Sequence, residues 1–222
     1  MTDLSNKAWV RMIMTVAKPV MNMKIVGQEN ILPEAAPAVY VCNHGMIYGA
    51  IAAMVHLPVH FRPWINEIML DPSSAAKSMA GTLNKDERSV KRIAAIISSA
   101  MNSFDAIPVS RTNPMAMIET IKESVSALEG GDNLLIFPEN PKEHYDKDSF
   151  RNLHPAFGIL GYRYYQSTGK RLHFYPVFSD SVNKTFSIGC PVIYTPGGNE
   201  GEEAQRIVEE VQRRMIQLSE QK

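Results

Sequence analysis

Short apolar segments of strand length alternate along this chain with longer segments whose apolar residues recur at helical spacing. The strand-like segments are 38–42, 59–65, 106–109, 133–137, 172–178 and 186–188. The helical segments are 47–55, 90–101, 114–128, 155–166 and 207–218. Strands that alternate with helices favour a mostly parallel sheet flanked by helices. Because 222 residues suit one sizeable core, we predict a single α/β domain over residues 25–222.

Residues 1–24 form a separate N-terminal segment, in which Trp9, Met12, Ile13 and Val16 lie at helical spacing among basic residues. The segment lacks the cleavage site of a signal peptide, and no apolar run reaches the roughly 18 residues of a membrane span. An amphipathic helix of this kind either packs on the domain or lies in the bilayer interface. The combination of Trp, Met and basic residues favours the interface, so we predict a membrane-surface element here.

Charge and cysteine content narrow the possible partners. Basic and acidic residues balance at 23 each, which argues against nucleic acid as a partner. Cys42 and Cys190 lie far apart and show no metal or redox spacing. We interpret both as buried free thiols, which is typical of a reducing compartment.

One stretch shows no clear periodicity. Residues 71–89 are rich in Ser, Ala, Lys and Asp and match neither the helical nor the strand pattern. We predict that they form a mobile loop or lid. The helix expected over 90–101 carries Ile93, Ile96, Ile97 and Met101 on one side, which we assign to its packed face.

Polar residues follow three of the predicted strands at the points where they end. Asn43-His44 follows the first strand, Arg111 follows 106–109, and Glu139 closes the segment after 133–137. Each alone has an ordinary explanation: a hydrogen-bonded histidine, a surface ion pair, a turn. In a parallel sheet, however, the carboxyl ends of strands meet at one edge, where ligands bind. Together the three supply a base, a cation suited to phosphate and a polar anchor.

Other chemistries fit these residues less well. Cys42 and His44 alternate at a strand end as a thiol–imidazole pair would, but a core cysteine explains the first equally simply. His144, Asp146 and Asp148 match no metal-ligand spacing and read as a solvated loop. We therefore predict no metal site and no bound cofactor.

The strand-end segments resemble the motifs of a known family, the glycerophosphate and lysophospholipid acyltransferases, which include 1-acylglycerol-3-phosphate acyltransferases. Asn43-His44 resembles the first motif, and residues 107–111, Ile-Pro-Val-Ser-Arg, resemble the second. Phe137-Pro138-Glu139 is similar to the start of the third, and Tyr175-Pro176-Val177 to the fourth. The resemblance covers residues 25–194. Each motif is short, and their order and spacing make the set specific.

The resemblance implies a reaction and roles for these residues. A histidine, here His44, accepts the proton of an acceptor hydroxyl that attacks the thioester of acyl-CoA or acyl-carrier protein. An arginine, here Arg111, holds the phosphate of the acceptor. We assign Asn43, Arg111, Glu139 and Lys142 to substrate binding.

The sequence departs from the family pattern at two places. The family carries an aspartate five positions after the histidine, where it orients the ring, and this chain has Gly49. The third motif usually continues Gly-Thr-Arg, whereas Glu139 is followed by Asn140-Pro141-Lys142, so a second arginine is missing.

Four residues are candidates to replace these lost groups. Glu67 aligns with a carboxylate that many relatives carry and is our candidate partner of His44, although it equally suits a helix cap or a salt bridge. Glu139 and Tyr48 are alternatives for supporting the ring. Lys142 can replace the missing arginine as a point charge.

Two functions from different classes follow. The first is transfer of an acyl chain from acyl-CoA or acyl-carrier protein to a lysophospholipid or similar hydroxyl, by a cytoplasmic protein bound peripherally to the inner membrane surface. The alternative is a catalytically inactive relative that binds lipid or acyl chains. Gly49 favours the alternative, whereas the presence of His44, Arg111 and Glu139 together favours the enzyme.

Overall fold

The computed structural model describes residues 21–45, 48–110, 113–139, 150 and 152–221. Its strands are β1 (Lys24–Val26), β2 (Ala38–Cys42), β3 (Phe61–Asn66), β4 (Ile107–Val109), β5 (Asn133–Ile136), β6 (His173–Asp180), β7 (Thr185–Ile188) and β8 (Val192–Ile193). Its α-helices are α2 (Tyr48–His56), α3 (Pro72–Leu83), α4 (Glu87–Ser103), α5 (Pro114–Glu129), α6 (Ile159–Thr168) and α7 (Glu200–Glu220). Short 3₁₀ turns include η3 (Glu67–Met69) and η5 (Pro155–Gly158).

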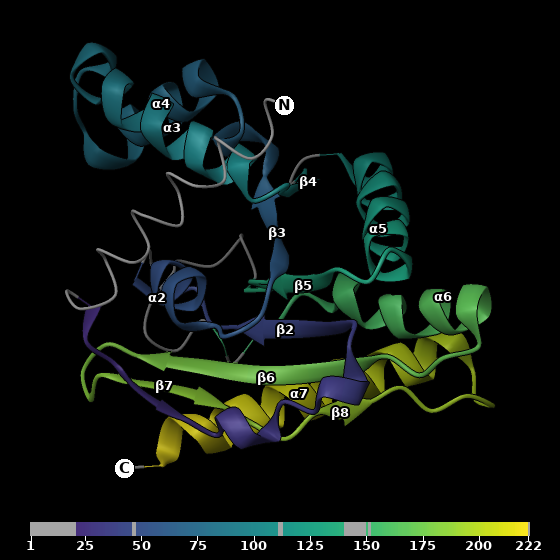
Figure 1. The fold of residues 1–222 in the computed structure, drawn as a ribbon. Coiled ribbons are helices and arrows are strands. Elements are labelled where there is room, and N and C mark those ends of the chain that lie inside the picture. Colours follow the sequence, from purple (N-terminus) through teal and green to yellow (C-terminus); the bar gives the residue numbers. More distant parts are fainter. Residues whose placement is uncertain (1–20, 46–47, 111–112, 140–149, 151, 222) are drawn as a thin grey trace, which may run out of the picture.

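The strands form one eight-stranded sheet in the order β1-β7-β6-β2-β5-β3-β4, with β8 paired to β6 (Figure 1). The pairs β1–β7, β6–β2, β2–β5, β5–β3 and β3–β4 are parallel. Only β7 and β8 pair with β6 in the antiparallel sense. The predicted α/β domain with a mostly parallel sheet is therefore confirmed.

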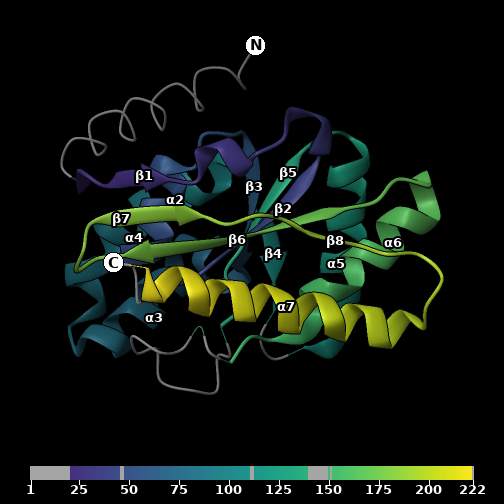
Figure 2. The same cartoon turned by 90° about the horizontal axis from the view of Figure 1, so that it is seen from below.

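Both faces of the central strands are buried, as is typical of parallel sheets. Val39 and Val41 of β2 point into a core that they share with α5, α6 and α7. Tyr40 and Cys42 point to the other face, where α2 covers the sheet. Figure 2 shows α7 running along the first of these faces. Alternation along β2 thus fixes which side chains leave its carboxyl end on each face.

The predicted loop or lid over 71–89 is wrong, because α3 and α4 form a helical hairpin there. Asp71 caps α3 by accepting a hydrogen bond from the Ser74 backbone N–H, and Asp86 caps α4 through the N–H of Arg88. The two helices pack through small residues in a cluster of their own: Ala75, Ala76, Val90 and Ala94, with Met69, Met79 and Ala80 against it. Helices that pack through alanines show no stripe of large apolar residues in the sequence. The helical periodicity of residues 71–89 therefore could not be recognised.

Two further sequence-based assignments need correction. The packed side of α4 carries Val90, Ala94 and Ser98, whereas Ile93 and Ile96, which we assigned to that side, are exposed. Cys42 is buried as predicted, but Cys190 is exposed, and neither forms a disulfide. The predicted helix within residues 1–24 lies, up to residue 20, outside the described residues. No helix in the described part of the chain is long and apolar enough to cross a membrane.

Candidate active site

The carboxyl ends of β2 and β5 are adjacent and bring two of the predicted motifs together. The strands pair in parallel with Val41 opposite Ile136, so the segments after them leave the sheet at the same edge. There the backbone N–H of His44 donates a 2.6 Å hydrogen bond to Oε1 of Glu139. Glu139 is 4% exposed, so its carboxylate is held in a desolvated position. The predicted convergence of His44 and Glu139 is therefore present.

The imidazole of His44 is fixed by packing. Its ring stands edge-on to Phe137, with 5.6 Å between the ring centroids and an interplanar angle of 84°. The side chain is half-buried, and its Nδ1 atom is buried. One side of the ring is therefore covered by protein, and a substrate can reach the imidazole only from the exposed side.

Asn43 ties the end of β2 to β6. Its Oδ1 accepts a hydrogen bond from the Ser179 N–H at 2.7 Å, and its Nδ2 donates to the Ser179 carbonyl at 3.1 Å. The side chain is buried and its amide thus satisfies both backbone groups of Ser179. We predicted a substrate-binding role for Asn43. The structure shows two hydrogen bonds between Asn43 and Ser179 that fix the end of β2, and with it the point at which the chain leaves the sheet at His44.

Gly49 lies at the start of α2 with its backbone pressed against the histidine segment. Its N–H donates to the His44 carbonyl at 3.1 Å. A Cβ at this position would stand 2.4 Å from the Asn43 carbonyl oxygen and 2.8 Å from that of His44. Both contacts are with backbone atoms, which cannot rotate away. The glycine is therefore required by this close approach, and an aspartate does not fit here without a shift of α2 or of the His44 backbone.

Glu67 lies at the carboxyl end of β3 and binds a residue of the second motif. Oγ of Ser110 donates a 2.6 Å hydrogen bond to Oε1 of Glu67, and Asn66 pairs with Val109 just before them. Because β5 separates β3 from β2, two strand spacings of about 4.8 Å each separate the Glu67 and His44 positions across the sheet. Glu67 thus holds Ser110, the residue that precedes Arg111 in the chain.

Arg111 and Lys142, both predicted to bind substrate, lie outside the described residues. The same holds for His144, Asp146 and Asp148. Among the residues that the structure does describe, no group of three His, Cys, Asp or Glu side chains is arranged to hold a metal ion.

Comparison with known proteins identifies the family. A family model described as Acyltransferase matches residues 22–158, which is more than half of the chain. The chain belongs to the acyltransferase family. The match includes the segments around His44, Arg111 and Glu139, whereas the fourth motif-like segment at 175–177 lies beyond it. Membership assigns the chain to acyl transfer as a general reaction class.

A solved structure shares the fold of this acyltransferase domain. The crystal structure of the 1-acyl-sn-glycerophosphate (LPA) acyltransferase PlsC from Thermotoga maritima superposes with a TM-score of 0.54 at 14% sequence identity. The superposition covers 100% of this chain and 85% of that one. At this identity the likeness establishes the fold. A search of curated proteins found no match.

Cys42 of the acyltransferase domain is an unsuitable nucleophile. Burial raises the pKa of its thiol well above the ordinary value, and the nearby negative charge of Glu139 raises the pKa further. A thiol with a raised pKa stays protonated at neutral pH, and the thiolate is the reactive form. The thiol–imidazole alternative therefore finds no support in this geometry.

Lys184 is a cation at the edge of the site that sequence reasoning missed. It lies in the turn between β6 and β7, just beyond the Asn43–Ser179 contact. Its Nζ lies 4.9 Å from the centroid of the Tyr48 ring and donates to the Tyr48 hydroxyl at 3.2 Å. Tyr48, which we proposed as a support for the His44 ring, thus has Lys184 as a partner. Lys184 and Tyr48 are 136 positions apart in the sequence, and nothing in the local sequence of the turn indicates their contact.

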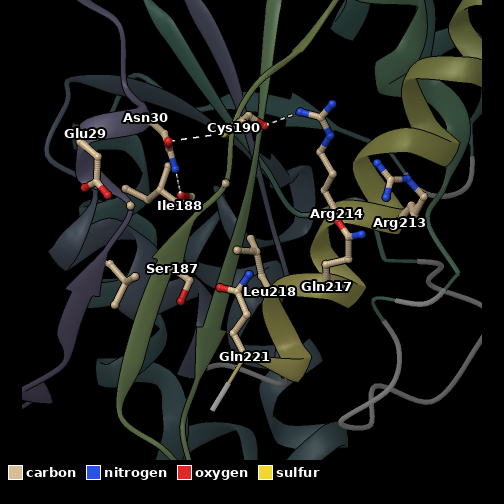
Figure 3. Close-up of a pocket in the computed structure, with 13 residues that line it drawn as sticks. Glu29, Asn30, Ser187, Ile188, Cys190, Arg213, Arg214, Gln217, Leu218 and Gln221 are labelled. Atoms are coloured by element: carbon tan, nitrogen blue, oxygen red, sulfur yellow. Dashed lines mark hydrogen bonds between the residues drawn. The ribbon is translucent and has the colours of Figure 1, made fainter.

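A surface groove of about 580 Å³ lies away from this constellation (Figure 3). Its lining includes Gly27, Ser187, Cys190, Arg214 and Leu218, from the β1–β7 edge and the C-terminal part of α7. Arg214 has a structural role in this groove, because it donates hydrogen bonds to the backbone carbonyls of Cys190 and Pro191. None of the strand-end residues of the candidate active site lines it, so the groove does not define the reaction site.

Proposed function

We propose that this protein transfers an acyl chain from a thioester donor, acyl-CoA or acyl-carrier protein, to the hydroxyl of a lysophospholipid or a similar lipid. His44 acts as the general base and takes the hydroxyl proton as the oxygen attacks the thioester carbonyl. The carbon–sulfur bond breaks, and the proton passes from the imidazolium to the departing thiolate. The products are an ester and a thiol, so atoms and charge balance without a cofactor.

One contact supports this proposal above the others, the hydrogen bond from the His44 N–H to Glu139. It brings the first and third motifs of the acyltransferase family together at the carboxyl ends of β2 and β5. General-base catalysis needs an imidazole held in a fixed position next to the acceptor. In place of the family aspartate, the Glu139 contact, the Phe137 packing and the close approach of Gly49 hold the segment.

The remaining predicted residues act on the acceptor in this proposal. Arg111 clamps the acceptor phosphate, since a guanidinium matches phosphate oxygens with two parallel donors. Glu67 binds Ser110, the residue before Arg111, and so fixes the chain just before Arg111. Lys142 adds a point charge where the family has a second arginine. The N-terminal segment 1–24 places the protein on the inner membrane surface, where its acceptor resides.

A catalytically inactive lipid-binding protein is the second candidate. It is favoured by Gly49, because this position carries no carboxylate and the surrounding backbone leaves no room for a side chain there. The two functions differ in a single observable, which is turnover of the thioester in the presence of the lipid acceptor.

The acceptor assignment is tested by replacing Arg111 with lysine, which keeps the charge and removes the planar fork. We expect wild type to acylate lysophosphatidic acid faster than the matching monoacylglycerol. Arg111→Lys should lower kcat/KM for the phosphorylated acceptor about tenfold, equivalent to loss of one charge-assisted hydrogen bond, and leave the monoacylglycerol rate unchanged.

The matched control is Arg163→Lys on α6, where the arginine is an exposed partner of Glu200 at 3.4 Å. This variant should behave as wild type with both acceptors. Equal acceptor preference in wild type and in Arg111→Lys would show that Arg111 does not bind the phosphate.

A further inference from the structure

The α3–α4 hairpin stands apart from the layers of the fold. In Figure 1 it projects beyond the sheet at the end of β3, and its small core is separate from the cores on the two sheet faces. It is joined to the candidate site through η3, whose Glu67 binds Ser110. Apart from Met101 of α4, which packs against the core on the α2 face of the sheet, the hairpin packs mainly on itself, so its outer surface lies away from the central core.

The outer side of α4 carries exposed aliphatic residues. Ile93 is 54% exposed and Ile96 is 58% exposed, and residues three apart lie on the same side of a helix. Leu83 at the end of α3 and Ile68 in η3 are exposed as well. A surface with several large aliphatic side chains on one projecting element indicates a contact that the isolated chain does not satisfy.

Basic residues border these isoleucines. Arg88, Lys91 and Arg92 are exposed, and Arg88, Arg92 and Ile96 follow one another at four-residue spacing along α4. Glu87, in the first turn, is the one acidic residue of the helix. Within the described part of the chain, no carboxylate lies within 4.0 Å of any of the three cations. The exposed side of α4 is thus apolar and positively charged, although the whole chain is neutral.

Charge decides between the possible partners of this surface. A second copy of the hairpin would bring its own cations against Arg88, Lys91 and Arg92. The segment of this chain outside the structure, residues 1–20, carries Lys7, Arg11 and Lys18 against a single acid, Asp3, so it too is basic. An anionic lipid surface complements both the cations and the isoleucines, since basic and aliphatic side chains on one face are typical of interfacial helices.

We infer that the α3–α4 hairpin is a lipid-contacting arm, in which Ile93 and Ile96 enter the interface of an anionic bilayer while Arg88 and Arg92 meet lipid phosphates. The inference deepens the proposed function by naming the surface that brings the site to a lipid acceptor. Because η3 connects the arm to Glu67 and Ser110, docking of the hairpin sets the carboxyl edge of the sheet next to the bilayer.

Vesicle co-sedimentation of the full chain tests the arm without requiring turnover. Wild type should bind vesicles of phosphatidylcholine with 30% phosphatidylglycerol, a composition we choose as about one-third anionic, and bind neutral vesicles more weakly. Arg88→Gln with Arg92→Gln should weaken anionic binding about thirtyfold, from roughly 1 kcal/mol per cation near the surface. Ile93→Ser with Ile96→Ser should weaken binding at least tenfold on both vesicle types.

The matched control is Lys170→Gln with Arg171→Gln, which removes two exposed cations before β6, at the opposite end of the sheet strands from the site. It should bind as wild type, and all variants should keep the wild-type melting temperature. Hairpin variants that are folded and bind anionic vesicles as tightly as wild type would overturn the inference. A loss of vesicle binding in the hairpin variants with acyl transfer to a short-chain soluble acceptor intact would separate docking from chemistry.

A fluorescent label distinguishes lipid from the other possible partners. An environment-sensitive dye on Ser99→Cys, in a Cys190→Ser background, lies beside Ile96 and leaves both isoleucines in place; Gln205→Cys on α7 is the control position. The inference requires a blue shift at Ser99→Cys on adding anionic vesicles. A blue-shifted signal in dilute protein without vesicles, or one that appears only as protein concentration rises, would overturn it in favour of the N-terminal segment or a second copy, respectively.

Discussion

At the scale of single residues, the candidate site rests on His44 and Glu139, which a backbone hydrogen bond joins across the ends of β2 and β5. Both were found because they follow apolar strands, and strand ends of parallel sheets collect ligand-binding groups. The bond from the His44 N–H to Glu139 and the two Asn43–Ser179 bonds depend on strand order, which a single sequence does not contain. The family pattern marks Gly49 as the place of a missing acid, whereas its role in the structure is close backbone approach.

Substitution of Gly49 tests this role directly. Gly49→Ala should lower the free energy of unfolding by about 1–3 kcal/mol, the usual cost of forcing atoms into a packed site. Gly49→Asp should lower it at least as much and reduce acyl transfer, because it displaces the His44 backbone. Gly81→Ala on α3 is the control, since its added Cβ meets nothing within 4 Å and should raise helix stability by up to about 1 kcal/mol. Denaturant unfolding measures the stability of all three variants, and acyl transfer by Gly49→Asp faster than by wild type would mean that the site lacks the aspartate that orients the histidine ring in the family.

At the scale of elements, helices with large apolar stripes, α4 included, were predictable, whereas α3, the first helix of the hairpin, was not. Ile207, Val208, Val211 and Met215 recur on one side of α7, and all four are buried as the stripe indicates. On α4 the same reasoning assigned Ile93 and Ile96 to the packed side. The alanines of α3 pack instead against Val90 and Ala94 and leave these isoleucines exposed. The uncovered isoleucines are the feature from which the lipid-contacting arm is inferred.

An ion-pair cluster secures α7 and gives a pH-dependent prediction. Glu210 accepts hydrogen bonds from Arg213 and from Arg214, and these, the Arg213 bond foremost, lower its pKa to about 2. A carboxylate with a lowered folded-state pKa stabilises the fold above its unfolded value of about 4.5, and this contribution is lost as pH falls toward 2. Glu210→Gln should therefore destabilise the protein by about 1–2 kcal/mol at pH 7, after discounting for partial exposure.

Urea unfolding between pH 7 and pH 2 measures this difference. The gap between wild type and Glu210→Gln should close as the pH falls through the range from 4.5 to 2. Glu209→Gln is the control, because within the described residues its exposed carboxylate accepts a hydrogen bond only from Gln205, and its effect should stay within about 0.5 kcal/mol. A gap that is constant over this pH range would mean that Glu210 stabilises α7 through packing and not through its charge.

At the scale of the whole molecule, the sequence predicted the fold class and the edge of the sheet that carries the site. It did so because the alternation of strands with helices leaves few topologies for a chain of this length. The antiparallel strands β7 and β8 and the position of β5 between β2 and β3 could not be predicted, since strand order is set by long-range packing. In the structure, one connected part of the fold contains the strand ends that carry His44, Glu139 and Glu67. The α3–α4 hairpin is attached to this part through η3.

The central claim is that His44 acts as the base of an acyl transfer although Gly49 replaces the family aspartate. The most direct measurement is the single-turnover rate of acyl transfer from acyl-CoA and acyl-carrier protein to lysophosphatidic acid, as a function of pH, for wild type and His44→Ala. The wild-type rate should rise with pH as the imidazole loses its proton, and His44→Ala should be about 10²–10⁴ slower with no such rise. Equal rates in the two proteins, or no turnover by a wild type that binds the lipid tightly, would contradict the claim.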